Sequence, residues 1–110
     1  MDIGGVQVAQ PNVGWVGGLS EGRIVCDMAA ARGVTIVPHC WKIGISISAT
    51  AHLAFATAHY AYIDYLPPQL CHETLRRELA FEELTRINGQ IPLPVKPGLR
   101  FELNTDALRA

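Results

Sequence analysis

Residues 34–39, with the sequence VTIVPH, form the stretch that decides the fold. This apolar run is typical of a strand buried on both faces, and it ends in the polar residue His39. Similar runs stand on either side of it: residues 3–11 precede Asn12, and residues 60–65 carry Asp64 near their end. The carboxyl ends of parallel strands meet at one edge of a sheet, where α/β enzymes keep their catalytic residues. We therefore expect these three polar side chains to converge.

Two helical stretches separate the three predicted strands. The first covers about residues 21–32, with Ser20 as its N-cap and Gly33 placed to end it. The second covers about residues 43–59 and is rich in alanine and other small residues, which suit close packing on a sheet. Strands and helices that alternate with short connections predict an α/β fold with parallel strands and right-handed crossovers.

The character of the sequence changes after Pro67, so we divide the chain into residues 1–66 and residues 67–110. The second part lacks the regular alternation of the first. Its expected elements are a short helix at residues 70–79 with Arg76 exposed, an Asn88-Gly89 hairpin turn between residues 84–87 and 90–93, a strand at residues 101–103, and a final turn capped by Asn104.

The composition is that of one small globular domain, with 110 residues, 49% hydrophobic residues and a net charge of −1. The nine basic residues are scattered, which argues against a nucleic-acid binder because such proteins carry a basic stripe. The most apolar window, residues 43–58, is too short to span a bilayer. The N-terminus has no secretory pattern, and the three cysteines have no paired spacing. These features predict reduced thiols and a cytoplasmic protein.

Four segments resemble one family, in the same order and with the same spacing. Residues 10–21, which include QPN and GGLSE, resemble the sixth-strand segment of the mandelate racemase/muconate-lactonizing enzyme branch of the enolase superfamily. Residues 37–39 and 62–64 resemble its seventh-strand and eighth-strand segments. Residues 89–102, with GQIPLP and PGL, resemble its C-terminal tail. The resemblance implies the last three βα units of a TIM (β/α)8 barrel, followed by a tail that packs on a capping domain.

The chemistry implied by this resemblance is Mg²⁺-dependent proton abstraction next to a carboxylate, most closely that of the acid-sugar dehydratases. His39 takes the position of a general base or acid. Asn12 stands where the family has an aspartate that orients this histidine, and we expect its amide oxygen to accept from the imidazole N–H. Asp64 stands where the family has a glutamate that contacts the substrate. Trp41 and Lys42 follow the histidine as candidate substrate-binding residues, with packing and solvation as the alternatives.

The carboxylates that hold Mg²⁺ in the family end earlier strands, which have no counterpart in this chain, so the resemblance assigns no metal ligand here. Three readings stay open. The chain is a fragment of an acid-sugar dehydratase, it belongs to a racemase or cycloisomerase of a carboxylate substrate, or it is a truncated non-catalytic remnant. Such a remnant would self-associate or pair with a missing N-terminal part, because three βα units leave sheet edges and apolar surface uncovered.

Overall fold

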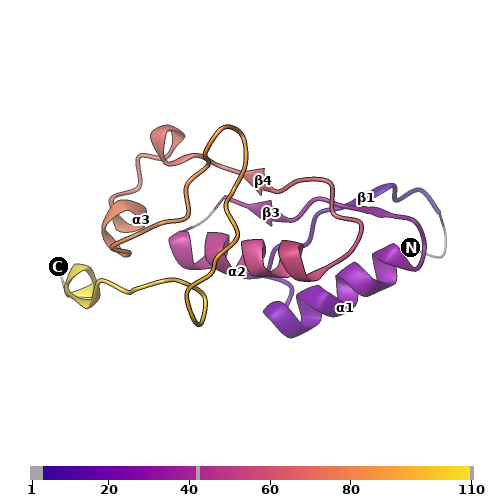
Figure 1. Cartoon of the computed structure of the whole chain (residues 1–110), viewed down its shortest axis with the longest axis horizontal. Helices are drawn as coiled ribbons and strands as arrows, with labels where there is room; N and C mark the ends of the chain where they lie inside the picture. Colours follow the sequence, from indigo (N-terminus) through magenta and orange to yellow (C-terminus); the bar gives the residue numbers. More distant parts are fainter. Residues whose placement is uncertain (1–3, 42, 110) are drawn as a thin grey trace.

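The structure, a computed structural model, describes residues 4–41 and 43–109 (Figure 1). It confirms the predicted alternation of strands and helices in the first part of the chain. The elements are β1 (Val8–Ala9), α1 (Leu19–Ala30), β2 (Thr35–Ile36), β3 (His39–Cys40), α2 (Gly44–Ala56), β4 (Asp64–Tyr65), the 3-10 helix η1 (Pro68–Leu70), α3 (Thr74–Glu78) and the 3-10 helix η2 (Thr105–Leu108).

The strands are parallel, and β2 and β3 are two parts of one run of chain that lies between the run of β1 and the run of β4. β1 pairs with β2, and β3 pairs with β4 so that His39 lies opposite Asp64. A parallel bridge between Ile36 and Tyr60 links the two pairs. The strands are shorter than the predicted runs because Pro11 and Pro38 have no backbone N–H to donate. The line of hydrogen bonds nevertheless continues, since the N–H of His39 donates to the carbonyl of Pro11 at 3.1 Å.

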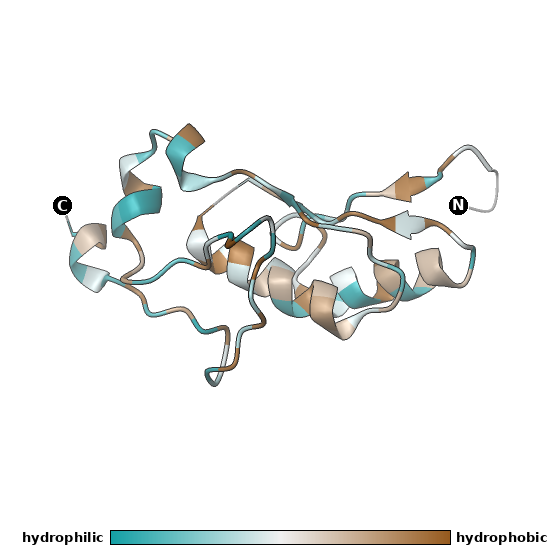
Figure 2. Cartoon of the chain, turned by 45° about the horizontal axis from the view of Figure 1, so that its top comes forward, coloured by the Kyte–Doolittle hydropathy of each residue, from teal (hydrophilic) through white to brown (hydrophobic). Residues whose placement is uncertain are grey.

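Both long helices cover the same face of the strands (Figure 1). The main cluster of buried side chains lies between them and the strands, and its members are Val13, Cys26, Ala29, Val34, Ile36, Ala49 and Leu53. The opposite face carries Val8, which is 51% exposed, and Tyr62, which is 66% exposed. Val8 belongs to β1, whose ribbon is coloured as hydrophobic in Figure 2. No helix within the described ranges is long and apolar enough to cross a membrane.

Helix α1 begins and ends two residues earlier than predicted, at Leu19 and Ala30, and the predicted role of Gly33 after its end is confirmed. Gly18, not Ser20, is its N-cap, because the turn that follows Asn12 delivers the chain directly into the helix through a bond from the Gly18 N–H to the Val13 carbonyl. At the other end Gly33 has a φ of 65°. The N–H of Val34 donates to the carbonyl of Ala29 at 2.9 Å, which closes a Schellman motif around Gly33.

Gly33→Ala is expected to lower the free energy of unfolding by about 1–2 kcal/mol. The cost lies in the backbone, because an added Cβ would meet nothing within 4 Å while the positive φ disfavours any L side chain. Urea denaturation of the full chain measures it. Gly33→Asn is the matched control and should lose less, since Asn tolerates this conformation. Equal stability of Gly33→Ala and the unchanged chain would contradict the positive φ assigned to Gly33 at the end of α1.

The second part of the chain folds back onto α2. The carbonyl of Leu99 accepts a hydrogen bond from Ser48 in the middle of that helix. At its start, a Cβ on Gly44 would come within 2.9 Å of the Phe101 ring, so a glycine is needed there. The helix spans Gly44–Ala56, shorter than the predicted residues 43–59. Packing of this tail on a capping domain stays a prediction.

Local turn signals in the second part are confirmed, whereas its longer elements are not. Asn88 and Gly89 have φ values of 50° and 82°, and Ile87 pairs with Gln90 across them in a single isolated bridge. Of the strand predicted at residues 101–103, Leu103 makes one isolated antiparallel bridge, to Ala80. Asn104 caps η2 by accepting from the N–H of Asp106. The helix predicted at residues 70–79 is wrong in extent, because η1 and α3 replace it with a break at residues 71–73.

Candidate active site

The three strand-end residues lie side by side at one edge of the strands. His39 and Asp64 are register partners in β3 and β4. Asn12 follows Pro11, whose carbonyl accepts the His39 N–H. Asn12 is buried, with 8% of its surface exposed, whereas His39 and Asp64 are half-buried. The structure therefore places one buried amide, one imidazole and one carboxylate next to one another at the carboxyl ends of the strands.

Asn12 contacts His39 with the opposite polarity to the one expected. The side-chain Nδ2 of Asn12 lies 3.0 Å from Nδ1 of His39. The Oδ1 of the same amide accepts the backbone N–H of Gly14, also at 3.0 Å. A backbone N–H can only donate, so it fixes the oxygen toward Gly14 and the NH₂ group toward the ring. Our expectation that Asn12 accepts from the imidazole was wrong, because the turn already occupies its oxygen.

Trp41 links His39 to Asp64. Its ring centroid lies 5.3 Å from that of His39, with the planes 30° apart. Its indole Nε1–H donates to Oδ1 of Asp64 at 2.9 Å. Trp41 thus orients a carboxylate that is 23 residues away in sequence. Substrate binding by Trp41 stays a prediction, and Lys42 lies outside the described residues.

Two neighbours of the site were missed by the sequence reasoning. Trp15 is exposed, and its ring is stacked against that of His39, with the centroids 6.3 Å apart and the ring planes 27° apart. A signal for it existed, since Trp15 stands three positions after Asn12 in the same glycine-rich loop. The second is Arg76.

Arg76 was predicted to be exposed, and this was wrong: only 3% of its surface is accessible. Its Nη2 donates to the carbonyl of Leu66 at 2.7 Å and to Oε1 of Glu83 at 2.6 Å. Leu66 directly follows β4, so this side chain holds the chain where it leaves the strand that carries Asp64. No local pattern signals this, because both partners come from segments that tertiary folding brings together.

The residues at this edge do not fit a magnesium ion. No three histidine, cysteine, aspartate or glutamate side chains in residues 4–41 and 43–109 lie close enough together to hold a metal. Asp64 is the one carboxylate of the three candidate residues, and it accepts the Trp41 N–H. Magnesium is usually held by one or two carboxylates together with substrate oxygens and water, in near-octahedral geometry. We therefore derive no step in this chain's chemistry through a metal.

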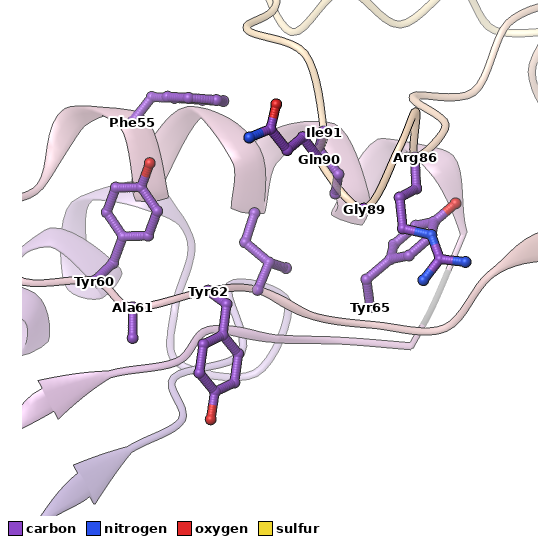
Figure 3. A pocket seen from close by; sticks show the side chains of 10 residues that line it. Phe55, Tyr60, Ala61, Tyr62, Tyr65, Arg86, Gly89, Gln90 and Ile91 are labelled. Carbon is purple, nitrogen blue, oxygen red and sulfur yellow. The ribbon is translucent and has the colours of Figure 1, made fainter.

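A cavity that is separate from Asn12, His39 and Asp64 is lined by the side chains drawn in Figure 3. It measures about 540 Å³ and lies between the end of α2, the segment leading into β4, and the Asn88-Gly89 turn. Phe55 and Tyr60 meet there edge to face, with ring centroids 6.3 Å apart, and Arg86 lines the cavity beside Tyr65. None of Asn12, His39 and Asp64 lines it. The strand edge, which gathers the reactive side chains, is the better candidate for an active site.

Comparison with known proteins shows which family the chain resembles. A family model described as enolase C-terminal domain-like matches residues 1–107. The chain is 33% identical over 113 residues to a D-galactarolactone cycloisomerase of Agrobacterium fabrum, with 98% of this chain and 30% of that protein covered. It is 30% identical over 98 residues to an arabinonate dehydratase of Saccharolobus solfataricus, with 89% of this chain and 25% of that protein covered.

Solved structures give the same picture. A mandelate racemase/muconate lactonizing enzyme from Jannaschia sp. CCS1 superposes with a TM-score of 0.82 at 25% identity, over 96% of this chain and 26% of that one. The 3,6-anhydro-D-galactonate cycloisomerase of Zobellia galactanivorans gives 0.82 at 30% identity, over 94% and 28%. The chain spans 30% or less of the length of these relatives. It belongs to the enolase C-terminal domain-like family, in the mandelate racemase/muconate-lactonizing enzyme branch of the enolase superfamily.

Proposed function

We propose that this chain is the C-terminal part of a Mg²⁺-dependent enzyme that acts on an acid sugar next to its carboxylate. Dehydration is the favoured reaction, on the strength of the residues 37–39 motif, with cycloisomerisation or racemisation as the alternative. The observation that carries the proposal is the contact chain from Asn12 through His39 and Trp41 to Asp64 at one strand edge. The names of the two curated relatives support an acid sugar or its lactone as the substrate.

In this proposal the three strand regions are strands six, seven and eight of a (β/α)8 barrel. His39 then faces the reacting part of the substrate, and Asp64 contacts a substrate oxygen, held in place by the Trp41 indole. Carboxylates outside this chain would hold the Mg²⁺, since those at its own strand edge do not fit the ion. The capping domain and earlier strands would select the particular sugar.

Complementation tests this function. The full chain is co-expressed with the segment of the Agrobacterium cycloisomerase that precedes the matched region, and the purified complex is assayed on a panel of aldonic and aldaric acids and their lactones. We expect turnover that disappears when EDTA removes Mg²⁺. The preceding segment alone is the first control, and a complex carrying Asn88→Asp in the exposed hairpin is the second. A folded complex that turns over none of these substrates would refute the proposal.

A second function is favoured by the uncovered apolar face: association without catalysis. Val8 and Tyr62 expose about half or more of their surfaces on the face that neither helix covers. Apolar surface beside open strand edges promotes pairing with another chain. We expect the purified chain to run above its monomer mass of 12.0 kDa in light scattering, and Val8→Lys to shift it toward the monomer. Val95→Lys, in the exposed tail, is the matched control. A monodisperse monomer would exclude self-association.

A further inference from the structure

We propose that Asn12 holds the imidazole of His39 in its neutral Nε2–H tautomer, so that His39 serves the site as a hydrogen-bond donor rather than as a proton-abstracting base. Asn12 is then a positioning residue, and the group that meets the substrate is the Nε2–H of His39. The catalytic half of this inference rests on the proposed function above. The tautomer itself is a property of the chain and stands on its geometry.

The orientation of the Asn12 amide is set by the protein backbone. The N–H of Gly14 needs an acceptor, and it finds Oδ1 of Asn12 at 3.0 Å. A flipped amide would oppose its NH₂ group to this N–H, placing two donors face to face in a buried turn. Asn12 has little room to escape this choice, since only 8% of its surface is exposed. Its NH₂ group therefore points at the ring.

The orientation of the amide determines where the imidazole proton sits. A neutral imidazole carries one N–H and one acceptor nitrogen. Nδ1 of His39 faces the Asn12 NH₂ group at 3.0 Å and must act as the acceptor, so the proton lies on Nε2. An aspartate at position 12 would reverse this arrangement, because a carboxylate can only accept and would draw the proton to Nδ1. The lone pair of Nε2 would then be open to take a proton.

This tautomer limits what His39 can do. Its Nε2 lone pair is not available, so Nε2 cannot abstract a proton from carbon. The remaining ability is to donate from Nε2–H without giving the proton up. A neutral histidine in this role polarises a carbonyl in known enzymes, and here it would stabilise negative charge that develops on a substrate oxygen.

The surroundings of the ring suit a fixed donor. Trp15 and Trp41 both contact it, at ring-centroid distances of 6.3 and 5.3 Å. The contacts from these two indoles and from Asn12 restrain rotation of the imidazole. A preorganised donor of this kind is effective because it needs no reorientation when charge develops. The indoles also offer apolar faces to a sugar beside the donor.

Nitrogen NMR tests the tautomer directly. The full chain is labelled with ¹⁵N-histidine, and long-range ¹H–¹⁵N correlations are recorded on the chain and on its complementation complex. His39→Gln assigns the His39 signals. We expect an unprotonated Nδ1 and a protonated Nε2 for His39, and in Asn12→Asp a proton on Nδ1. Asn88→Asp makes the same chemical change at an exposed site and should leave the pattern unaltered.

The outcomes of this experiment test the tautomer, the role of Asn12 and the proposed function separately. A proton on Nδ1 in the unchanged chain overturns the inference, even if Asn12→Asp fails to fold. A pattern that Asn12→Asp leaves unchanged removes Asn12 as the cause. If Nε2–H is observed while the complementation complex turns over no acid sugar, the tautomer stands and the proposed function fails. If turnover is found together with Nδ1–H, the proposed function stands and the donor role fails.

Discussion

Arg76→Met is expected to destabilise the chain by about 3–5 kcal/mol, the usual cost of removing one partner of a buried ion pair. Arg76 is 3% exposed, and its guanidinium neutralises Glu83 through Nη2 at 2.6 Å. It also satisfies the carbonyl of Leu66. Methionine keeps much of the length and apolar volume of arginine. The loss of stability therefore comes from the Glu83 carboxylate, which is left without its ion-pair partner, and from the Leu66 carbonyl, which is left without its donor. Urea denaturation, monitored by circular dichroism, measures the change.

Two variants separate this explanation from simple loss of packing. Arg23→Met removes an exposed pair with Asp27, whose side chains are 51% and 58% accessible, and should cost at most about 1 kcal/mol. Arg76→Met combined with Glu83→Leu should recover most of the stability, since no charge is left buried alone. Nη1 of Arg76 finds no hydrogen-bond partner among the described residues, so the native pair is itself imperfect. If Arg76→Met alone lowers the free energy of unfolding by less than about 1 kcal/mol, this explanation is wrong.

The features that sequence reasoning predicted are those set by neighbours along the chain. Apolar runs and prolines mark the strands, and the polar residues after them must share an edge once the strands are parallel. Gly33 and the Asn88-Gly89 turn follow from backbone conformations that few other residues adopt. Each of these signals acts within a few residues, and the structure reproduces them.

Most features that the sequence reasoning missed are set by contacts outside the immediate neighbourhood along the chain. The polarity of the Asn12 amide is the exception, because it is set by a local turn that brings the N–H of Gly14, two residues on, to its oxygen. The burial of Arg76 depends on Glu83 and on the Leu66 carbonyl, which a helical pattern cannot reveal. The bond from Trp41 to Asp64 follows only from the register of β3 and β4. For Asn12 and Trp41 the sequence predicted the location but not the hydrogen-bond partner, and for Arg76 it predicted neither.

His39→Ala is expected to lower kcat of the complementation complex about 10²–10³-fold, the usual cost of losing one preorganised donor to a developing oxyanion. His39→Gln should recover at least about tenfold of this loss, because the amide N–H of glutamine reaches close to the place of the imidazole Nε2–H. The measurement is kcat and KM on the best substrate found. His72→Gln, at an exposed histidine, is the matched control and should leave both constants unchanged.

The comparison between these two His39 variants separates a donor from a base. An amide can donate a hydrogen bond but cannot take up a proton at neutral pH, so glutamine rescues a donor and does not rescue a base. If His39→Gln is as slow as His39→Ala, with KM unchanged, proton transfer by the imidazole is the better explanation and the Asn12 amide must turn during the reaction. If glutamine restores kcat, the imidazole is not the base, and proton abstraction belongs to a residue other than His39. His39 would then supply orientation and charge stabilisation, while the metal is held by the remainder of the enzyme.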